Sequence, residues 1–196
     1  MTFQQQISVG IIGSGNMANS RAKRFNKVEG FELKAVASRN SETGNKLAQE
    51  YDIEYIADWQ DLLSQEYIDA VVICTHNDSH GEIVISALEH EKHVFMEYPL
   101  ARDIKQGERA VILAKKKGKV LRLTHREQVS PMHARLQQVV QENSPLRVAT
   151  FSRLTPGRGA RPEILFNLNI SGPPALFFIY HVHPVIDLFG PVEWVE

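Results

Sequence analysis

The sequence has little cysteine, no long apolar run and no excess of charge of either sign. Its single cysteine, Cys74, cannot form an internal disulfide, so we expect a reducing, cytoplasmic environment rather than a disulfide-stabilised secreted domain. No apolar run approaches the ~20 residues that span a bilayer, and Met1–Gln6 lack the features of a secretory signal. Basic residues number 22 and acidic residues 23, a balance that gives no reason to expect nucleic acid or a membrane surface as a partner.

Short apolar segments rich in β-branched residues alternate instead with amphipathic segments. Buried parallel strands are expected at 7–12, 33–37, 70–74, 93–96 and 119–124, with a weaker one at 55–56. Helices are expected at 16–27, after a cap at Ser41, through 62–63, at 82–89, at 104–117 and from Pro131. In the helix 104–117, Ile104, Val111 and Ile112 align along one apolar face. This alternation predicts an α/β fold with a doubly wound parallel sheet.

The pattern of apolar and polar residues changes after Asn143-Ser-Pro145. An alternation of apolar and polar residues predicts a strand at 147–152, and a further strand is expected at 192–195. Between these two strands we expect a loop at 155–162 and the apolar helix 175–189. We therefore place the first domain at 1–145. The segment 146–196 is expected to begin a second α+β domain, an incomplete one that serves substrate binding or oligomerisation.

The loop after the first expected strand reads Gly13-Ser-Gly15-Asn16-Met17-Ala18, a G-x-G-x-x-A pattern that opens a helix. The first glycine permits a tight turn, the second lets the backbone approach a pyrophosphate, and Ala18 lets the helix pack closely on the strand. The helix start at Asn16 and Met17 supplies N–H groups for phosphate oxygens. The pattern predicts a dinucleotide-binding Rossmann domain; the alternative is a chance glycine turn.

The end of the second expected strand bears on the choice of coenzyme. Domains of this kind that bind NAD usually carry an acidic residue there, which binds the ribose 2′-hydroxyl. This sequence reads Ser38-Arg39-Asn40 instead. A hydroxyl and a guanidinium can bind a 2′-phosphate, and no carboxylate repels it, so we expect NADP as the cofactor, with NAD possible. The alternative is that Arg39 is a solvated loop residue.

Two further polar segments follow expected strands, at the edge where such sheets bind ligands. They are Cys74-Thr75-His-Asn77-Asp-Ser-His80 and Met96-Glu97-Tyr98-Pro99. With the glycine pattern, their order and spacing resemble the Gfo/Idh/MocA oxidoreductase family, whose fingerprint is a T-P-N-x-x-H stretch followed by E-K-P. The resemblance extends over essentially the whole chain. It implies that four residues line the nicotinamide ribose side of the coenzyme site: Thr75, Asn77, His80 and Glu97.

Tyr98 stands where the family has the lysine of E-K-P. The E-Y-P sequence resembles the biliverdin reductases, a group within this family, as do Leu100-Ala101, His125 and Glu127. The resemblance implies a pocket like that of a tetrapyrrole reductase. The arginine-rich later helix of that group is not matched, because the segment here reads Tyr180-His-Val-His-Pro-Val-Ile-Asp187.

Tyr98, His125 and His183 are the candidate catalytic residues. Tyr98 would orient the substrate or donate a proton, because a reference pKa of ~10 makes tyrosine a plausible acid and a poor base. The wider family commonly has a catalytic histidine three residues before an aspartate; here His183 lies four before Asp187 and could share its helical face. The alternative for each histidine is a partly buried structural role.

Two functions from different classes remain open on the sequence. The first is an NADP-dependent oxidoreductase that passes hydride between nicotinamide and a small organic substrate. The second is a nucleotide-binding subunit without turnover, acting in regulation or assembly, which the missing lysine and the short segment 146–196 favour. No metal is expected, because the pairs His76/His80 and His181/His183 lack an H-E-x-x-H pattern, a cysteine pair or converging carboxylates.

A protein partner is expected through 146–196. The two strands predicted there have few partners in the chain, and strand edges without partners recruit other strands. The helix 175–189 is apolar nearly all round, so one neighbouring domain cannot cover it. We therefore expect this segment to contact a second copy of the chain or a different protein.

Overall fold

A computed structural model describes residues 6–125, 127–145, 147–151, 163, 167–172 and 175–194. The chain divides into two compact units, Met1–Thr124 and His125–Glu196. The first unit holds β1 (Ile7–Ile12), α1 (Asn16–Phe25), β2 (Phe31–Ala37), α2 (Ser41–Tyr51), β3 (Glu54–Ile56), α3 (Trp59–Leu63), β4 (Ala70–Ile73), α4 (His80–Glu89), β5 (His93–Met96), α5 (Ile104–Lys117) and β6 (Leu121–Leu123). The second holds α6 (Pro131–Glu142), α8 (Leu168–Ser171) and α9 (Ala175–Phe189). Within the described ranges, no helix combines the length and the apolar character needed to cross a membrane.

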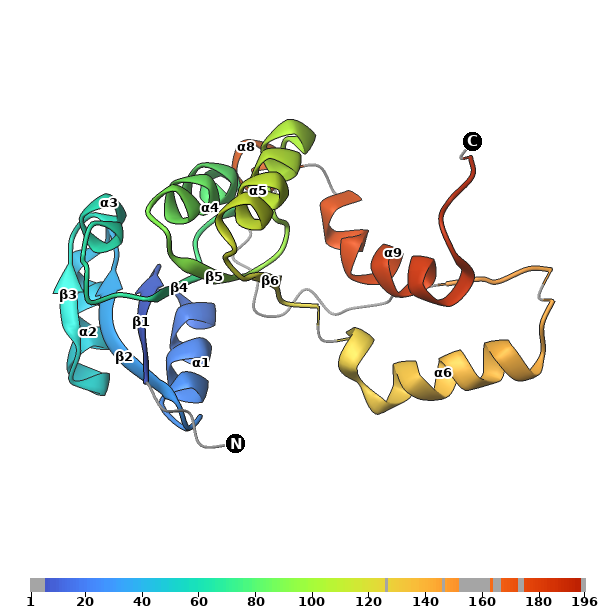
Figure 1. The fold of residues 1–196 in the computed structure, drawn as a ribbon, viewed down its shortest axis with the longest axis horizontal. Coiled ribbons are helices and arrows are strands. Elements are labelled where there is room, and N and C mark those ends of the chain that lie inside the picture. The colour runs from blue at the N-terminus through green and yellow to red at the C-terminus, as the bar shows by residue number, and fades with distance from the viewer. Residues whose placement is uncertain are drawn as a thin grey trace. The chain divides into compact units, whose positions relative to one another are not determined.

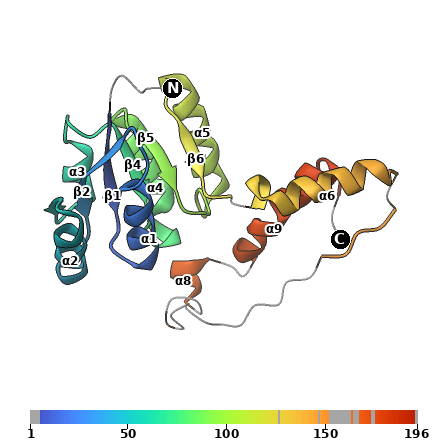
Figure 2. The same ribbon diagram turned by 90° about the horizontal axis from the view of Figure 1, so that it is seen from below.

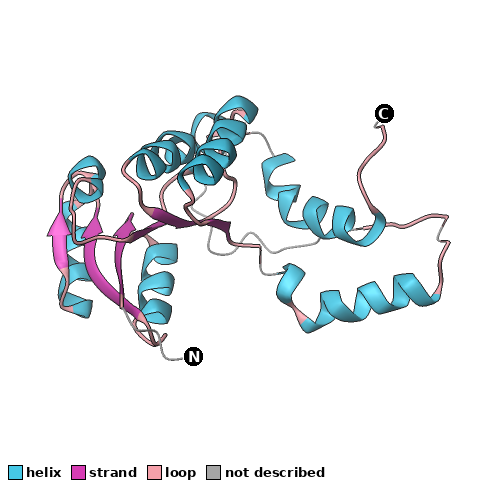
Figure 3. Ribbon diagram, in the orientation of Figure 1, coloured by secondary structure: helices cyan, strands magenta, loops and turns pink. Residues whose placement is uncertain are grey.

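The first unit is a parallel sheet with the strand order β3-β2-β1-β4-β5-β6, which confirms the predicted doubly wound α/β fold (Figures 1 and 3). Every neighbouring pair of strands runs parallel. The order reverses direction between β1 and β4, because the chain builds outward from β1 on one side and from β4 on the other. In sheets of this kind the carboxyl edge at that reversal is where ligands bind.

The sheet is buried on both faces because the central strands direct apolar side chains to each of them. Ile11 and Val9 pack with α1 and α2, through Ala18, Ala22 and Leu47. Ile12 and Ile73 point to the other face, where residues of α3, α4 and α5 cover them. This two-sided burial explains why the strand sequences read as continuous apolar runs rather than as an alternation of apolar and polar residues.

Two helix boundaries depend on a capping side chain or on glycine, and a third differs from its expected position. The cap of α2 is Asn40, not Ser41 as expected: its side chain accepts a hydrogen bond of 3.0 Å from the N–H of Thr43. α1 ends at Phe25, earlier than the expected residue 27. α5 ends at Gly118, which has a positive φ of 62°, after three lysines that suit the negative end of the helix dipole.

The packing face of α5 is formed by small residues and not by the apolar residues that align along the helix. Ile104, Val111 and Ile112 are all exposed, whereas Ala110 and Ala114 are buried. The small alanines let α5 approach α4 closely, so the packing face is set by residue size and not by the larger apolar residues.

In the second unit, α6 and α9 lie side by side (Figure 2). The helix expected at 175–189 is confirmed. The strands expected at 147–152 and 192–195 are wrong over the described residues 147–151 and 191–194, which have no neighbouring strand to pair with and form no ladder. The loop predicted at 155–162 lies outside the described residues. The second compact unit begins at His125, before the domain boundary expected near 145, and includes α6.

Candidate functional site

The loops that follow the central strands are held in register by backbone hydrogen bonds that continue the sheet. The N–H of Gly13 donates to Ala37 at 2.8 Å, and that of Cys74 donates to Ile12 at 2.8 Å. The N–H of Glu97 donates to Ile73 at 3.0 Å. The glycine loop, the segment after β4 and the E-Y-P segment therefore meet at one edge of the sheet.

The glycine loop has the shape that a pyrophosphate site requires. Gly13 has a φ of +112°, and a Cβ there would lie 2.5 Å from the carbonyl oxygen of Cys74, so only glycine fits. Gly15 precedes α1, and a Cβ built on it meets no atom within 4 Å. No described side chain caps the start of α1, where Asn16 and Met17 are exposed. The first N–H groups of the helix are thus open to an anion.

Three hydroxyl groups cluster near the end of β2, those of Ser14 after β1, Ser38 after β2 and Thr43 in α2. The Oγ of Ser14 lies 2.7 Å from the Oγ of Ser38 and 2.6 Å from the Oγ1 of Thr43. Arg39 is exposed directly after Ser38 and forms no hydrogen bond or ion pair with the described residues. Ser14 and Thr43 were not predicted, although hydroxyls at the turn and in the first turn of α2 were visible in the sequence. The donors present here fit a 2′-phosphate.

His80 ties together the two loops that follow β4 and β5. Its side chain is fully buried, with Nδ1 2.6 Å from the carbonyl oxygen of Pro99 and Nε2 3.2 Å from that of Thr75. Burial lowers the pKa of His80, although the two carbonyls oppose the shift. A neutral ring carries one N–H and so donates to one of these two carbonyls, while the ring as a whole packs between the two loops.

Thr75 and Asn77 lie in the loop that His80 anchors. Both are half-buried, and Asn77 begins the short 3-10 turn Asn77–Ser79. The hydroxyl of Ser79 donates to the Oγ1 of Thr75 at 2.9 Å and contacts the carbonyl of His76 at the same distance. The structure thus brings Thr75 and Asn77 to the same sheet edge as the glycine loop.

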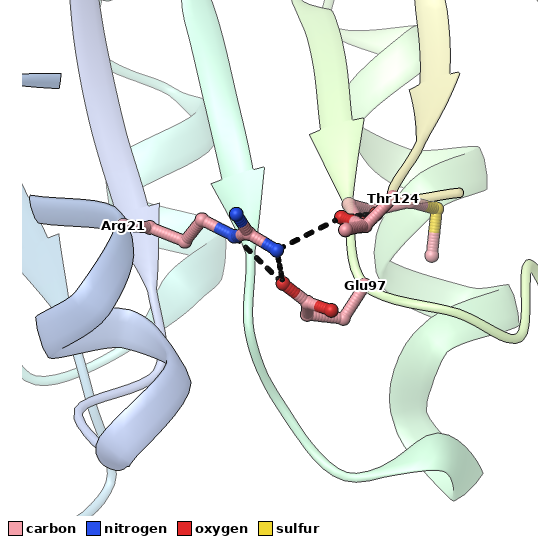
Figure 4. A network of polar contacts seen from close by, with 4 residues as sticks. Arg21, Glu97 and Thr124 are labelled. Atoms are coloured by element: carbon pink, nitrogen blue, oxygen red, sulfur yellow. Dashed lines mark hydrogen bonds and ion pairs between the residues drawn. The ribbon is translucent and has the colours of Figure 1, made fainter. Parts of the chain in front are cut away.

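Glu97 is held by a buried arginine that sequence reasoning missed (Figure 4). The Nε and Nη2 atoms of Arg21 donate to its Oε1 at 2.7 and 2.5 Å. The same Nη2 lies 3.3 Å from the Oγ1 of Thr124. The signal that could have found Arg21 is a cation on the face of α1 that buries Ala18 and Ala22.

The thiol of Cys74 lies close enough to Glu97 and Arg21 for their charges to affect its pKa. The pKa of Cys74 is raised to about 12, mainly by burial and also by the carboxylate of Glu97, while the guanidinium of Arg21 opposes the shift. Cys74 is therefore a neutral thiol at physiological pH and not a nucleophile. Tyr98 follows Glu97 directly, is half-buried, and precedes Pro99 through a cis peptide bond.

In the second unit, the structure brings His125 and His183 together. Their ring centroids lie 4.7 Å apart, and the Nε2 of Gln128 lies 2.6 Å from the Nδ1 of His183. Asp187, expected to share a helical face with His183, has other partners.

Those partners come from α6. The Oδ2 of Asp187 lies 2.6 Å from the Nε2 of the buried His133 and accepts a 2.9 Å hydrogen bond from Gln137. His133 and Gln137 were not predicted; their spacing of one helical turn was the available signal. Among the described residues, no group of three or more histidine, cysteine or acidic side chains could hold a metal ion.

Known proteins resemble this chain in sequence and fold. Residues 7–125 match the family described as "Oxidoreductase family, NAD-binding Rossmann fold" (GFO_IDH_MocA). The crystal structure of biliverdin reductase in complex with biliverdin and NADP+ from Synechocystis sp. PCC 6803 superposes with a TM-score of 0.88 at 29% identity, covering 96% of this chain and 60% of that one.

Two relatives from Bacillus subtilis (strain 168) cover most of the chain. The "Uncharacterized oxidoreductase YrbE" is 26% identical over 180 residues, which are 91% of this chain and 52% of the relative. The "scyllo-inositol 2-dehydrogenase (NADP(+)) IolU" is 26% identical over 198 residues, 97% of this chain and 60% of the relative. The chain thus spans between 52% and 60% of the length of these two relatives.

Proposed function

Because the chain belongs to the Gfo/Idh/MocA oxidoreductase family, with its NAD-binding Rossmann fold, we propose that it is an NADPH-dependent reductase of a small organic substrate, with bilins as the first candidates. The observation that carries the proposal is the meeting of two features at one sheet edge. These are the glycine loop with its uncapped helix start and the Glu97–Tyr98 pair.

Each end of the coenzyme has residues that suit it. The backbone of Gly13 and Gly15 and the N–H groups of Asn16 and Met17 suit the pyrophosphate. Ser38 and Arg39 suit the 2′-phosphate, and the absence of a carboxylate at this position favours NADP over NAD. Thr75, Asn77 and Glu97 suit the nicotinamide ribose. Bound NADPH supplies a hydride.

Reduction of a carbon–carbon or carbon–oxygen double bond adds a hydride to one atom and a proton to the other. Tyr98 is proposed to orient the substrate and to donate that proton, since a phenol is an acid at physiological pH. A bilin is the first substrate to test because two observations agree on it. The E-Y-P sequence resembles that of the biliverdin reductases, and the neighbour with a TM-score of 0.88 is a biliverdin reductase. The catalytic role expected of His125 and His183 stays a prediction.

A single glycine variant tests coenzyme binding without damaging the fold. Gly15 has a φ of −81°, which any residue can adopt, and space for a side chain. Aspartate is a good residue to cap a helix, so Gly15→Asp should keep or raise the melting temperature. The same carboxylate should repel the phosphates and abolish NADPH binding in a fluorescence titration. Gly15→Ala is the matched control, with a side chain but no charge.

Substrate is then sought with the wild-type chain and NADPH. We expect loss of NADPH absorbance with biliverdin or with one member of a set of carbonyl compounds. Binding of NADPH without turnover on any of them would contradict the reductase and favour the regulatory subunit. Equal NADPH affinity in the Gly15→Asp chain would contradict the coenzyme site itself.

A further inference from the structure

Arg21 is an arginine in an unusual place. It lies on α1, eight residues after Gly13, and its side chain is only 8% exposed. A guanidinium loses much hydration free energy on burial unless it is paired and hydrogen-bonded. Here it is paired with Glu97, whose side chain is 11% exposed, and it lies 5.4 Å from the ring centroid of Phe95.

The geometry of the pair is one-sided. An arginine that binds a carboxylate for strength alone usually donates to both oxygens in parallel. Arg21 instead donates twice to Oε1 of Glu97, through Nε at 2.7 Å and Nη2 at 2.5 Å. The described residues donate no hydrogen bond to Oε2. Figure 4 shows the two oxygens of Glu97, with only one of them turned to Arg21.

The network also joins three parts of the sheet edge. Arg21 comes from the helix whose start suits the pyrophosphate, and Glu97 follows β5. Thr124, which follows β6, receives the third contact of the guanidinium at 3.3 Å and donates its hydroxyl to the carbonyl of Met96 at 3.0 Å. A change in the Arg21 contact would therefore move the carboxylate of Glu97 while leaving the glycine loop in place.

We propose that Arg21 is a positioning residue for the nicotinamide half of the coenzyme. It holds the Glu97 carboxylate in place through Oε1, so that Oε2 is presented to the ribose hydroxyls. It takes no part in binding the adenosine half. This inference rests on the proposed function, because it assumes a nicotinamide nucleotide at this edge.

The two halves of the coenzyme separate this role from a structural one. The probe for the adenosine half is 2′,5′-ADP, and the probe for the whole is NADPH, each titrated calorimetrically against the full chain. Arg21→Lys keeps the charge but not the double donation to one oxygen, and Arg21→Met removes both. Arg24→Met removes a cation from an exposed position of the same helix and is the matched control.

We expect the dissociation constant of NADPH to rise about tenfold or more in both Arg21 variants, as for the loss of a charge-assisted contact. That of 2′,5′-ADP should change less than about twofold, since its contacts lie elsewhere, and Arg24→Met should change neither. Melting temperatures establish that each variant is folded. Where the unpaired carboxylate keeps Arg21→Met from folding, Arg21→Lys carries the test.

Equal losses for the two ligands in a folded Arg21 variant would make the pair a structural feature of α1 and overturn the inference. Unchanged NADPH affinity in Arg21→Lys and Arg21→Met would overturn it as well. A wild-type chain that binds neither ligand would instead refute the proposed function. These three outcomes are distinct in one set of titrations.

Discussion

The Nδ1 atom of His80 lies 2.6 Å from the carbonyl oxygen of Pro99, which joins the first residue of α4 to the loop after β5. The other ring nitrogen lies 3.2 Å from the carbonyl oxygen of Thr75. The ring thereby spaces two loops of the candidate coenzyme site. Neither loop pairs with a strand beyond the strand ends. We therefore expect the His80 side chain to fix much of the position of one loop relative to the other.

His80→Ala should destabilise the chain by about 2 kcal/mol or more, because it removes the N–H donor from a buried carbonyl and opens a cavity. The free energy of unfolding is measured by urea denaturation. His90→Ala is the control: it ends the same helix with a ring nitrogen 2.9 Å from the carbonyl of Ser86, but it is exposed. Equal losses in the two variants would show that His80 does not hold the loops.

The same residue gives a pH dependence with a definite sign. Burial lowers the pKa of His80 below its usual 6.5, so below pH 6.5 the unfolded chain takes up a proton that the folded chain does not. The contribution of the neutral His80 ring to the unfolding free energy is complete above pH 6.5 and is lost as the pH falls toward the pKa of the folded chain. Between pH 6.5 and 5 the unfolding free energy should fall by up to ~1.4 kcal/mol per pH unit more steeply than in His80→Asn.

His93, whose pKa burial also lowers, contributes equally to both chains and cancels in the comparison. Parallel pH profiles for the wild-type chain and His80→Asn would contradict this assignment of the acid sensitivity.

The sequence was sufficient where the signal is local. Ile7–Ile12 and Ala70–Ile73 are mostly apolar and rich in β-branched residues, and such runs form strands in a sheet covered on both faces. The glycine loop was predictable for the same reason, since its pattern lies within residues 13–18. The close approach of the Cys74 carbonyl to Gly13, which excludes a side chain there, could not be read from that pattern.

Contacts between distant residues could not be predicted in this way. Arg21 and Glu97 are 76 residues apart in the sequence, and Arg21 and Thr124 are 103 apart. No local pattern specifies such pairs, because only the strand order brings them together. The apolar pattern of α5 did not identify its buried face either, because Ala110 and Ala114 pack in the core while Ile104, Val111 and Ile112 are exposed.

Arg39→Ala should narrow the preference for NADPH over NADH. The guanidinium is exposed and has no partner among the described residues, so it is available to a 2′-phosphate, a charge-assisted bond worth roughly 1.5–3 kcal/mol. Affinities for both coenzymes are measured by fluorescence titration. Lys46→Ala, an exposed cation in the body of α2, is the control for loss of charge. Equal affinities of the wild-type chain for the two coenzymes would contradict the proposed specificity.

Tyr98→Phe should lower turnover while leaving the affinity for NADPH nearly unchanged, because only the hydroxyl is proposed to act on the substrate. Steady-state rates with the substrate found by screening give the test. Tyr67→Phe is the matched control, since it removes an exposed phenol that bonds to Glu54. An unaltered rate in Tyr98→Phe would make Tyr98 a packing residue beside Pro99. Tyr98→Lys restores the family's lysine, and activity on polyols would then indicate descent from a polyol dehydrogenase.

The second unit exposes large apolar side chains in rows. On α9, Val182, Ile186 and Phe189 are 46%, 40% and 41% exposed at spacings of four and three residues, which places them on one side of the helix. Met132, Leu136 and Val139 repeat the same spacing on α6 and are also exposed. Rows of exposed apolar side chains are typical of interfaces, so the two rows are candidates for one.

We propose that 146–196 contacts a second copy of the chain or a different protein through the row on α9. Light scattering over a range of concentrations should show a species larger than the monomer, and Ile186→Asp should shift it toward the monomer, because a carboxylate opposes burial of the row. Val120→Asp, an equally apolar exposed site in the first unit, should have no such effect. A wild-type chain that stays monomeric and does not aggregate refutes self-association, and the row on α9 then serves a different protein.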